Sequence, residues 1–124
     1  MGDVRLRGHR ILVVEDHYLV AADTARLVSG AGGEALGPFR SEAAALASAE
    51  SNLATAAILD INLGTEDSLG LATTLLERGI PVVFLTGYTA VPLPERLARI
   101  PCLIKPVASE ALIEALLSAI GRGP

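Results

Sequence analysis

The sequence predicts an α/β fold in which a parallel sheet of five strands lies between two layers of helices. Three observations support this prediction. Short aliphatic runs recur along the chain of 124 residues, segments with apolar residues at helical spacing separate those runs, and two of the runs end in acidic residues. Strands that alternate with helices form right-handed crossovers, and such crossovers produce parallel sheets with both faces covered.

The length and composition favour one domain over residues 1–124. A chain of 124 residues matches the usual domain size of about 100–150 residues. Hydrophobic residues make up 51% of the chain and aromatic residues only 3%. The core must therefore consist of Ala, Val, Leu and Ile side chains, which favours helices packed closely on a sheet.

The charge and the single cysteine restrict the possible partners and location. A formal charge of −4 provides no basic surface of the kind that nucleic-acid phosphates attract. The sequence contains no charged leader and no apolar stretch of about 18 residues, and its one cysteine, Cys102, excludes an internal disulfide. We therefore expect a cytoplasmic protein that binds neither nucleic acid directly nor a membrane.

The first strand and the first helix are predicted near the N-terminus. Ile11 to Val14 are β-branched or aliphatic, which is typical of a strand buried on both faces, and the run ends in Glu15 and Asp16. A helix is then expected until the Gly30–Gly33 stretch ends it. Its aligned apolar residues are Tyr18, Ala21, Ala25 and Val28.

The second and third strands are predicted on either side of an alanine-rich helix. Glu34–Gly37 is a short, weak strand candidate, and Ser41 caps the helix that follows. A further buried strand is predicted for Ala56–Leu59 and, like the first, it ends in an acid, Asp60. The aligned residues of the helix are Ala43, Leu46, Ala47 and Leu53.

The fourth unit begins after a predicted loop over Asn62–Asp67. A helix with Leu69, Ala72 and Leu76 aligned ends at Gly79, and the strand Pro81–Leu85 follows and leads into Thr86. Pro92 and Pro94 then occupy the only place for a fourth helix, so we expect that helix to be short or poorly held.

The last unit completes the predicted sheet. Cys102–Ile104 is a short strand that ends at Lys105-Pro106, and the closing helix carries a regular apolar stripe of Ile113, Leu116, Leu117 and Ile120. Five such units predict a flavodoxin-like (βα)5 three-layer sandwich with the strand order 2-1-3-4-5.

Polar residues follow four of the predicted strands. They are Glu15 and Asp16, Asp60, Thr86 and Lys105. In open parallel sheets ligands bind outside the carboxyl ends of the strands, so we expect these side chains to meet in one pocket. Three carboxylates in one place repel one another, and a hard divalent cation that prefers oxygen ligands, Mg²⁺ or Mn²⁺, relieves that repulsion.

Such a pocket suits phosphoryl transfer. A carboxylate can attack a phosphoryl group to form an acyl phosphate, and Asp60 is the candidate nucleophile because it lies between the other groups. Lys105 would offset charge on the phosphoryl group, and the Thr86 hydroxyl could donate to one of its oxygens. Glu15 and Asp16 would then be metal ligands.

From about His9 to Gly121, the chain resembles the receiver domains of bacterial two-component response regulators. In that family an acidic pair, a phospho-accepting Asp, a Thr or Ser and a Lys-Pro follow the first, third, fourth and fifth strands. The resemblance implies that Asp60 accepts a phosphoryl group from a histidine kinase or a histidine phosphotransfer protein. It also implies an unidentified downstream protein as the target of the signal.

The same resemblance implies two details of the site. The backbone carbonyl of Asn62 would join Glu15, Asp16 and Asp60 around the metal. The peptide bond between Lys105 and Pro106 would be cis, which is physically accessible before proline although uncommon.

One position departs from the family pattern. Receiver domains usually carry Tyr or Phe three residues before the lysine, where this chain has Cys102. The string Phe84-Leu85-Thr86-Gly87-Tyr88 instead resembles the FATGUY subgroup of single-domain receivers, with Leu in place of the usual Ala. The resemblance implies that the usual Thr–aromatic coupling is absent, and we hypothesise that Tyr88 and the segment Pro92–Arg99 carry the signal.

Two residues near the site have simpler interpretations. His17 adjoins the acids and is interpreted as a residue at the start of a helix, with a catalytic role left open. Cys102 is interpreted as a small buried apolar residue, because no neighbour in the sequence suggests an activated thiolate.

The leading functional hypothesis is a signalling switch that catalyses only its own phosphotransfer and dephosphorylation, with no output domain after Gly121. A fragment of a larger response regulator or hybrid kinase is a second possibility. The enzyme alternative is a Mg²⁺-dependent aspartyl-phosphate phosphohydrolase, although Asn62 stands where such enzymes place a second acid. A receiver that acts as a constitutive scaffold is a further alternative, and the complete set of site residues argues against it.

Overall fold

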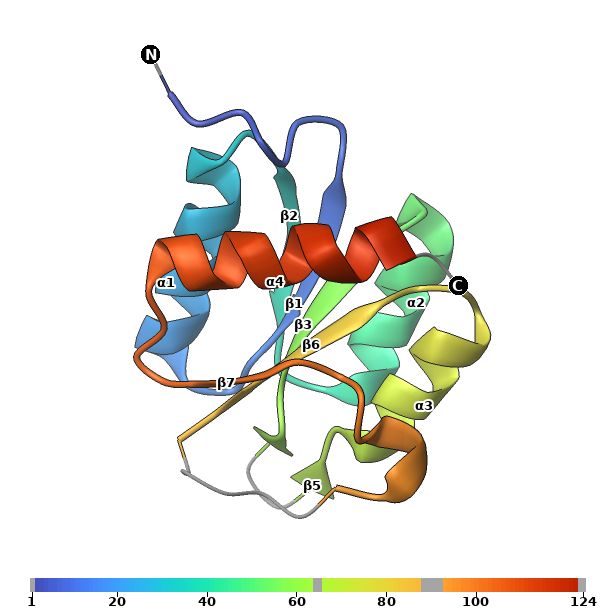
Figure 1. Ribbon diagram of the computed structural model, residues 1–124. Helices are drawn as coiled ribbons and strands as arrows, with labels where there is room; N and C mark the ends of the chain where they lie inside the picture. The colour runs from blue at the N-terminus through green and yellow to red at the C-terminus, as the bar shows by residue number, and fades with distance from the viewer. Residues whose placement is uncertain (1, 64–65, 88–92, 123–124) are drawn as a thin grey trace.

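The central sheet of the computed structural model, which describes residues 2–63, 66–87 and 93–122, has five parallel strands in the order β2-β1-β3-β6-β7 (Figure 1). Counted along the chain, this is the predicted order 2-1-3-4-5. The strands are β1 (Arg10–Val14), β2 (Glu34–Phe39), β3 (Ala56–Asp60), β6 (Val82–Thr86) and β7 (Cys102–Ile104).

A short antiparallel pair follows β3 where the sequence predicts a loop. It consists of β4 (Asn62–Leu63) and β5 (Glu66–Asp67), with Asn62 opposite Asp67. This pair projects beyond the carboxyl end of β3 (Figure 1). It therefore lies at the edge of the sheet where the polar residues were expected to gather.

Four α-helices cover the sheet in the part of the chain that the structure describes. They are α1 (Tyr18–Gly30), α2 (Glu42–Asn52), α3 (Leu69–Glu77) and α4 (Ser109–Arg122). Between β6 and β7 a short 3₁₀ helix, η1 (Glu95–Leu97), takes the place of an α-helix. Pro94 immediately precedes it with an extended ψ of 149°, so the described part of this connection confirms the expectation of a short helix. None of the described helices has the length and apolar character that a membrane crossing requires.

The central strands are buried on both faces, and alternate residues face different helices. In β3, Ala57 and Leu59 belong to a core with α2, α3 and η1, whereas Ala56 and Ile58 belong to a core with α1 and α4. This alternation follows from the period of two in a strand. The continuous aliphatic runs of the sequence thus reflect a sheet that is covered on both sides.

The buried face of α2 agrees with the predicted one only at Leu46, which packs against the core. Ala45 and Ala49 are buried, whereas Ala43 and Ala47 are exposed and Leu53 is 78% exposed. Alanine occupies several sides of this helix, so the apolar pattern does not select one face. The packing of α2 on β1 and β2 decides which alanines lie inside.

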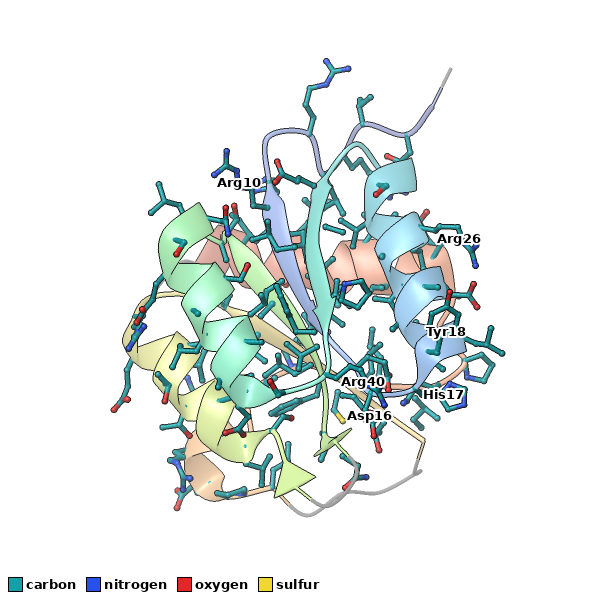
Figure 2. All side chains as sticks on the ribbon, turned by 180° about the vertical axis from the view of Figure 1, so that it is seen from behind. Arg10, Asp16, His17, Tyr18, Arg26 and Arg40 are labelled. Atoms are coloured by element: carbon teal, nitrogen blue, oxygen red, sulfur yellow. The ribbon has the colours of Figure 1, made fainter. Side chains whose placement is uncertain are left out.

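Tyr18 also lies outside the core, contrary to the predicted alignment. It is the first residue of α1 and its side chain is 81% exposed, whereas Ala21 and Val28 of the same helix are buried. Tyr18 lies at the start of α1, next to His17 (Figure 2), so helical spacing alone does not place a residue in the core.

A bulge in β2 shapes the edge of the sheet. Leu12 of β1 pairs with Leu36, but Val14 pairs with Phe39, so β2 contains one extra residue. Gly37 lies in this bulge with a φ of +103°, and the Gly37–Pro38 peptide bond is cis. The strand therefore runs two residues past its predicted end, which is possible because edge strands tolerate proline.

Candidate functional site

The carboxyl ends of the strands bring the predicted polar residues together. Glu15 follows β1, Asp60 ends β3, Thr86 ends β6 and Lys105 follows β7. The backbone N–H of Lys105 donates to the Thr86 carbonyl at 2.7 Å, which extends the pairing of β6 and β7 past the last residue of β7. The parallel sheet thus carries these residues to one edge, as the rule for such sheets predicts.

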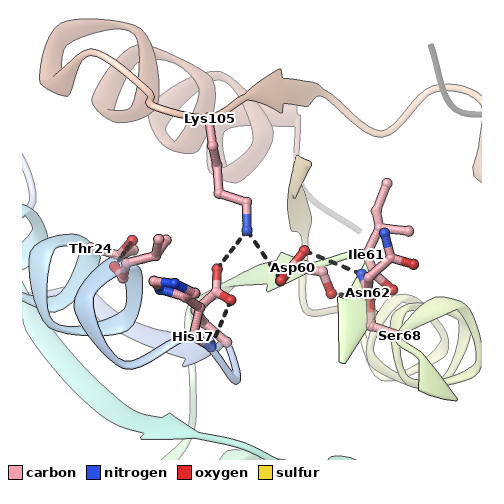
Figure 3. Close-up of polar contacts among 9 residues, drawn as sticks. His17, Thr24, Asp60, Ile61, Asn62, Ser68 and Lys105 are labelled. Atoms are coloured by element: carbon pink, nitrogen blue, oxygen red, sulfur yellow. Dashed lines mark hydrogen bonds and ion pairs between the residues drawn. The ribbon is translucent and has the colours of Figure 1, made fainter. Parts of the chain in front are cut away.

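Lys105 bridges two buried carboxylates (Figure 3). Its Nζ lies 3.0 Å from Glu15 Oε1 and 3.2 Å from Asp60 Oδ2. The side chains of Glu15 and Asp60 are only 3% and 6% exposed. Charged groups this deeply buried need a partner of opposite sign, so Lys105 is an integral part of the site.

Burial shifts the pKa values within this group. Burial raises the pKa of Glu15 to about 7, and the neighbouring Asp60 carboxylate acts in the same direction. The His17 N–H and Lys105 counteract part of this shift. Burial alone would lower the pKa of Lys105, but its contacts with Glu15 and Asp60 outweigh that effect and raise it above its ordinary value.

Asp16 completes a cluster of three carboxylates. One oxygen of each of Glu15, Asp16 and Asp60 lies within 4.8 Å of the others. With all three ionised, the cluster and the Lys105 ammonium together carry two negative charges. Oxygen donors and this charge fit a divalent ion such as Mg²⁺, which takes one or two carboxylates and completes its shell with water and phosphate oxygens.

The local backbone holds the Asp60 carboxylate in place. Oδ1 accepts a hydrogen bond from the Asn62 N–H at 3.2 Å, while Oδ2 faces Lys105. Asn62 begins β4 directly beside the acid, and its side chain is exposed. The expected use of its carbonyl as a metal ligand stays a prediction.

Ser68 also belongs to this site, although it was not among the residues predicted from the sequence. Its hydroxyl donates to the backbone carbonyl of Asp60 at 2.7 Å, and the residue is fully buried. A serine directly before a helical segment is a typical N-cap signal. That signal predicts a contact with α3, however, and gives no indication of a bond to the strand.

His17 lies at the start of α1, as predicted. Its backbone N–H donates to Glu15 Oε2 at 3.1 Å, and its imidazole is exposed. The residue therefore contributes to the site through its backbone, because the N–H of an N-cap residue helps to orient the Glu15 carboxylate. A role for the imidazole has no support in these contacts.

Some of the other predicted site features lie in the described part of the chain, and others lie wholly or partly outside it. Thr86 is 1% exposed at the end of β6, beside the strand that carries Asp60, and the Lys105–Pro106 peptide bond is cis as expected. Tyr88 lies outside the described residues, and so does the start of the Pro92–Arg99 segment. The proposed signalling role of that segment stays a prediction.

Cys102 is exposed, contrary to the expectation of a buried residue. It lies on β7, which is an edge strand, and Ile104 on the same strand is 47% exposed while Leu103 between them is partly buried. The alternation of a strand thus turns Cys102 away from the core. Partial burial raises the pKa of its thiol, which disfavours the reactive thiolate.

A cavity of about 350 Å³ opens beside the acids. Asp16, Tyr18 and Arg40, which Figure 2 labels, lie on its wall. The cavity therefore adjoins two of the three clustered acids, Glu15 and Asp16. Its lining residues are Glu15, Asp16, Tyr18, Ala21, Ala22, Pro38 and Arg40.

Comparison with known families gives no matching family model and no matching curated protein sequence. Solved structures do match. The chain is similar to SdrG from Pseudomonas melonis Fr1, solved in its BeF3-activated conformation, with 33% identity, a TM-score of 0.76 and coverage of 97% of this chain and 99% of that chain.

Two further structures support the same likeness. The signal receiver domain of a modulated diguanylate cyclase from Desulfovibrio desulfuricans G20 shares 30% identity over 91% of this chain and 94% of that chain, with a TM-score of 0.79. A CheY-like response regulator receiver domain protein from Methanospirillum hungatei JF-1 shares 23% identity over 92% of this chain and 94% of that chain, with a TM-score of 0.76, and so shows a likeness of fold.

Proposed function

The chain belongs to the receiver domains of response regulators, and from this premise we propose that it is switched by a phosphoryl group on Asp60 with Mg²⁺ beside it. The observation that carries the proposal is the arrangement of charge around that residue. The Lys105 ammonium lies 3.2 Å from Asp60 and 3.0 Å from Glu15, and one oxygen of each of Glu15, Asp16 and Asp60 lies within 4.8 Å of the others. A nucleophile that adjoins both an ammonium and a cluster of oxygen ligands suits phosphoryl transfer, which depends mainly on positioning and charge neutralisation.

The proposed step transfers the phosphoryl group from a histidine to Asp60. One carboxylate oxygen attacks phosphorus, the new O–P bond forms, and the N–P bond breaks. The electron pair of that bond stays on the imidazole nitrogen, which then takes up a proton from solvent. The product on this chain is an acyl phosphate.

The residues around Asp60 would each contribute to this step. The Asn62 N–H and Lys105 hold the two carboxylate oxygens, so the nucleophile is oriented before the donor arrives. Lys105 would neutralise charge on the phosphoryl oxygens, and Thr86 would donate a hydrogen bond to one of them. Glu15, Asp16 and Asp60 would hold Mg²⁺, which would supply further positive charge to the phosphoryl oxygens.

The proposed partners are a histidine kinase or a histidine phosphotransfer protein as donor and a downstream protein as target. SdrG, at 33% identity, adopts a BeF3-activated conformation, and BeF3 mimics a phosphoryl group, so a similar chain responds to such a ligand. We further propose, from the Phe84–Gly87 resemblance, that the signal leaves through the segment after β6 in the manner of the FATGUY subgroup.

We also propose that the chain catalyses only its own phosphorylation and dephosphorylation. A phosphohydrolase that works through an aspartyl phosphate needs a second acid near the nucleophile to protonate the leaving group, and Asn62 cannot supply that proton. Steady multiple turnover of a small phosphomonoester by the purified protein would contradict this part of the proposal.

Intact-mass measurement tests the central claim. The protein is incubated with acetyl phosphate and Mg²⁺, alongside Asp60→Asn and the matched control Asp23→Asn, whose acid pairs with Arg26 on the exposed side of α1. We expect one phosphoryl adduct on the wild type and on Asp23→Asn, and none on Asp60→Asn. An unmodified wild type, or an adduct that persists on Asp60→Asn, would overturn the proposal.

A further inference from the structure

We propose that Ser68 is a positioning residue for the phospho-accepting carboxylate, an inference that rests on the function proposed above. Ser68 is 0% exposed, and its Oγ lies 2.7 Å from the backbone carbonyl oxygen of Asp60 (Figure 3). The same Oγ lies 3.5 Å from the Ile61 carbonyl oxygen. Because the Ser68 hydroxyl is shielded from solvent, it affects the fold or the site only through its contacts with these two carbonyls.

The hydrogen bond from Ser68 supplies a partner for a backbone carbonyl at the end of β3. The pairing of β1 with β3 ends at Val14 and Leu59, so Asp60 lies one residue past the last pair on that side. A buried backbone carbonyl without a partner is costly, and the Ser68 hydroxyl supplies the partner. Ser68 precedes α3 at its N-cap position but makes no side-chain cap bond, so its hydroxyl serves the strand in place of the helix.

Ser68 also closes the loop that carries the neighbours of Asp60. Its backbone N–H donates to the Ile61 carbonyl at 2.9 Å, so one residue binds two successive carbonyls at the start of the loop. Within that loop, the Asn62 N–H donates to Asp60 Oδ1 at 3.2 Å. Fixing the backbone at Asp60 and Ile61 therefore fixes the direction of the carboxylate and of the Asn62 backbone.

The geometry gives Ser68 an indirect role. It touches the backbone of Asp60 and not the carboxylate, so it acts on the reaction through the position of another residue. Ser68→Ala removes the hydroxyl and little volume, and it leaves the second loop bond, from the Ser68 N–H, in place. A lost hydrogen bond corresponds to about a three- to tenfold change in an equilibrium constant. We expect changes of that size in divalent-ion affinity and in the rate of phosphorylation.

The experiment compares Ser68→Ala with Thr24→Val in the full chain. Thr24 is a matched control because its buried hydroxyl also donates to a backbone carbonyl, that of Val20 in α1, at 2.8 Å. Three quantities are measured for each protein. They are the dissociation constant for Mn²⁺ by electron paramagnetic resonance, the rate of phosphorylation by acetyl phosphate from intact masses, and the urea midpoint of unfolding.

We expect both variants to lose some stability and only Ser68→Ala to lose Mn²⁺ affinity and phosphorylation rate, each by about three- to tenfold. Wild-type affinity and rate in Ser68→Ala, or equal losses in Thr24→Val, would overturn the positioning role while a labelled wild type still supports the proposed function. A wild type that binds Mn²⁺ but gains no phosphoryl group would overturn the proposed function and the inference with it.

Discussion

Lys105 and Glu15 lie 90 residues apart in the sequence, yet Nζ of the lysine is 3.0 Å from Oε1 of the glutamate. The same ammonium is 3.2 Å from Asp60 Oδ2. Lys105 therefore stabilises two buried negative charges in the resting site, and in the proposed reaction it would turn to the incoming phosphoryl group. This double role leads to the first prediction.

Lys105→Gln should slow phosphorylation by roughly a hundredfold, because removing one preorganised electrostatic partner of a transition state typically has an effect of that order. It should leave Mn²⁺ binding as tight as in the wild type or tighter, because the carboxylate cluster loses a competing positive charge. Initial rates from intact masses and Mn²⁺ titrations measure the two quantities. Weaker Mn²⁺ binding in this variant would show that Lys105 mainly organises the acids.

Asp16→Asn should weaken Mn²⁺ binding by roughly ten- to a hundredfold, the range known for changes around metal sites. The reason is that the cluster loses one of its three carboxylates. Chelation with EDTA should abolish phosphorylation of the wild type. Isothermal titration with Mn²⁺ measures the affinity, with Asp23→Asn as the control for loss of an exposed acid. Phosphorylation that persists at full rate in EDTA would exclude the proposed role of the metal.

The pairing of Arg5 with α4 should give the protein a pH-dependent stability. Arg5 Nη2 donates to Glu110 Oε1 at 2.9 Å, and Arg5 also contacts Asp3. Arg5 holds the pKa of Glu110 below its ordinary value and lowers the pKa of Asp3 to about 2. Because both folded-state pKa values are depressed, the stabilisation is present above the ordinary pKa values and is lost as the pH falls through the depressed ones.

Arg5→Gln should therefore be less stable than the wild type at pH 7, and the difference should shrink as the pH falls from about 5 towards 2. Urea midpoints at several pH values measure it, with Arg26→Gln as the control because Arg26 pairs only locally with Asp23 in the described contacts. The ion pairs of Arg5 with Asp3 and with Glu110 are exposed, so high salt should reduce the difference in stability between Arg5→Gln and the wild type. A difference that widens in acid would contradict this explanation.

Gly37→Ala should destabilise the fold by about 1–3 kcal/mol, the usual cost of a residue forced into an unfavourable backbone conformation. Gly37 has a φ of +103°, and an added Cβ would lie 2.7 Å from the Phe39 nitrogen. Gly70→Ala is the matched control, since nothing lies within 4 Å of its added Cβ in helix α3. Alanine there should stabilise the protein by at most about 0.5–1 kcal/mol, because Gly70 lies in the first turn of α3 and the full effect belongs to the middle of a helix. Equal urea midpoints for the two variants would contradict the claim that alanine is strained at position 37.

Much of the sheet and the placement of the site could be predicted from local patterns. Buried strands are continuous aliphatic runs, and the acids Glu15, Asp16 and Asp60 interrupt or directly follow those runs. Because parallel strands present their carboxyl ends at one edge, strand ends that are far apart in the sequence could be assigned to one place. The convergence of Lys105 with the acids follows from that rule, and the order 2-1-3-4-5 follows from the flavodoxin-like fold that five such units predict.

The burial of single residues on the outer elements could not be predicted in the same way. Ala45 and Ala49 face the core in place of Ala43 and Ala47, and Cys102 is exposed at the edge of the sheet. Alanines on all sides of a helix give similar patterns for several rotations, so contacts with the neighbouring strands select one. The exposure of Cys102 depends on β7 being the last strand, which limits what can cover it.

The sequence by itself therefore determined which polar residues reach the carboxyl edge, because that depends on local periodicity and one topological rule, and it indicated the order of the strands through the flavodoxin-like fold that five βα units predict. Only the tertiary structure decided how those residues are held. The Lys105 bridge and the Ser68 bond to the Asp60 carbonyl join groups from different elements. Which acceptor a hydroxyl or an ammonium reaches depends on distances of about 3 Å, and the spacing of residues in a sequence does not specify those distances.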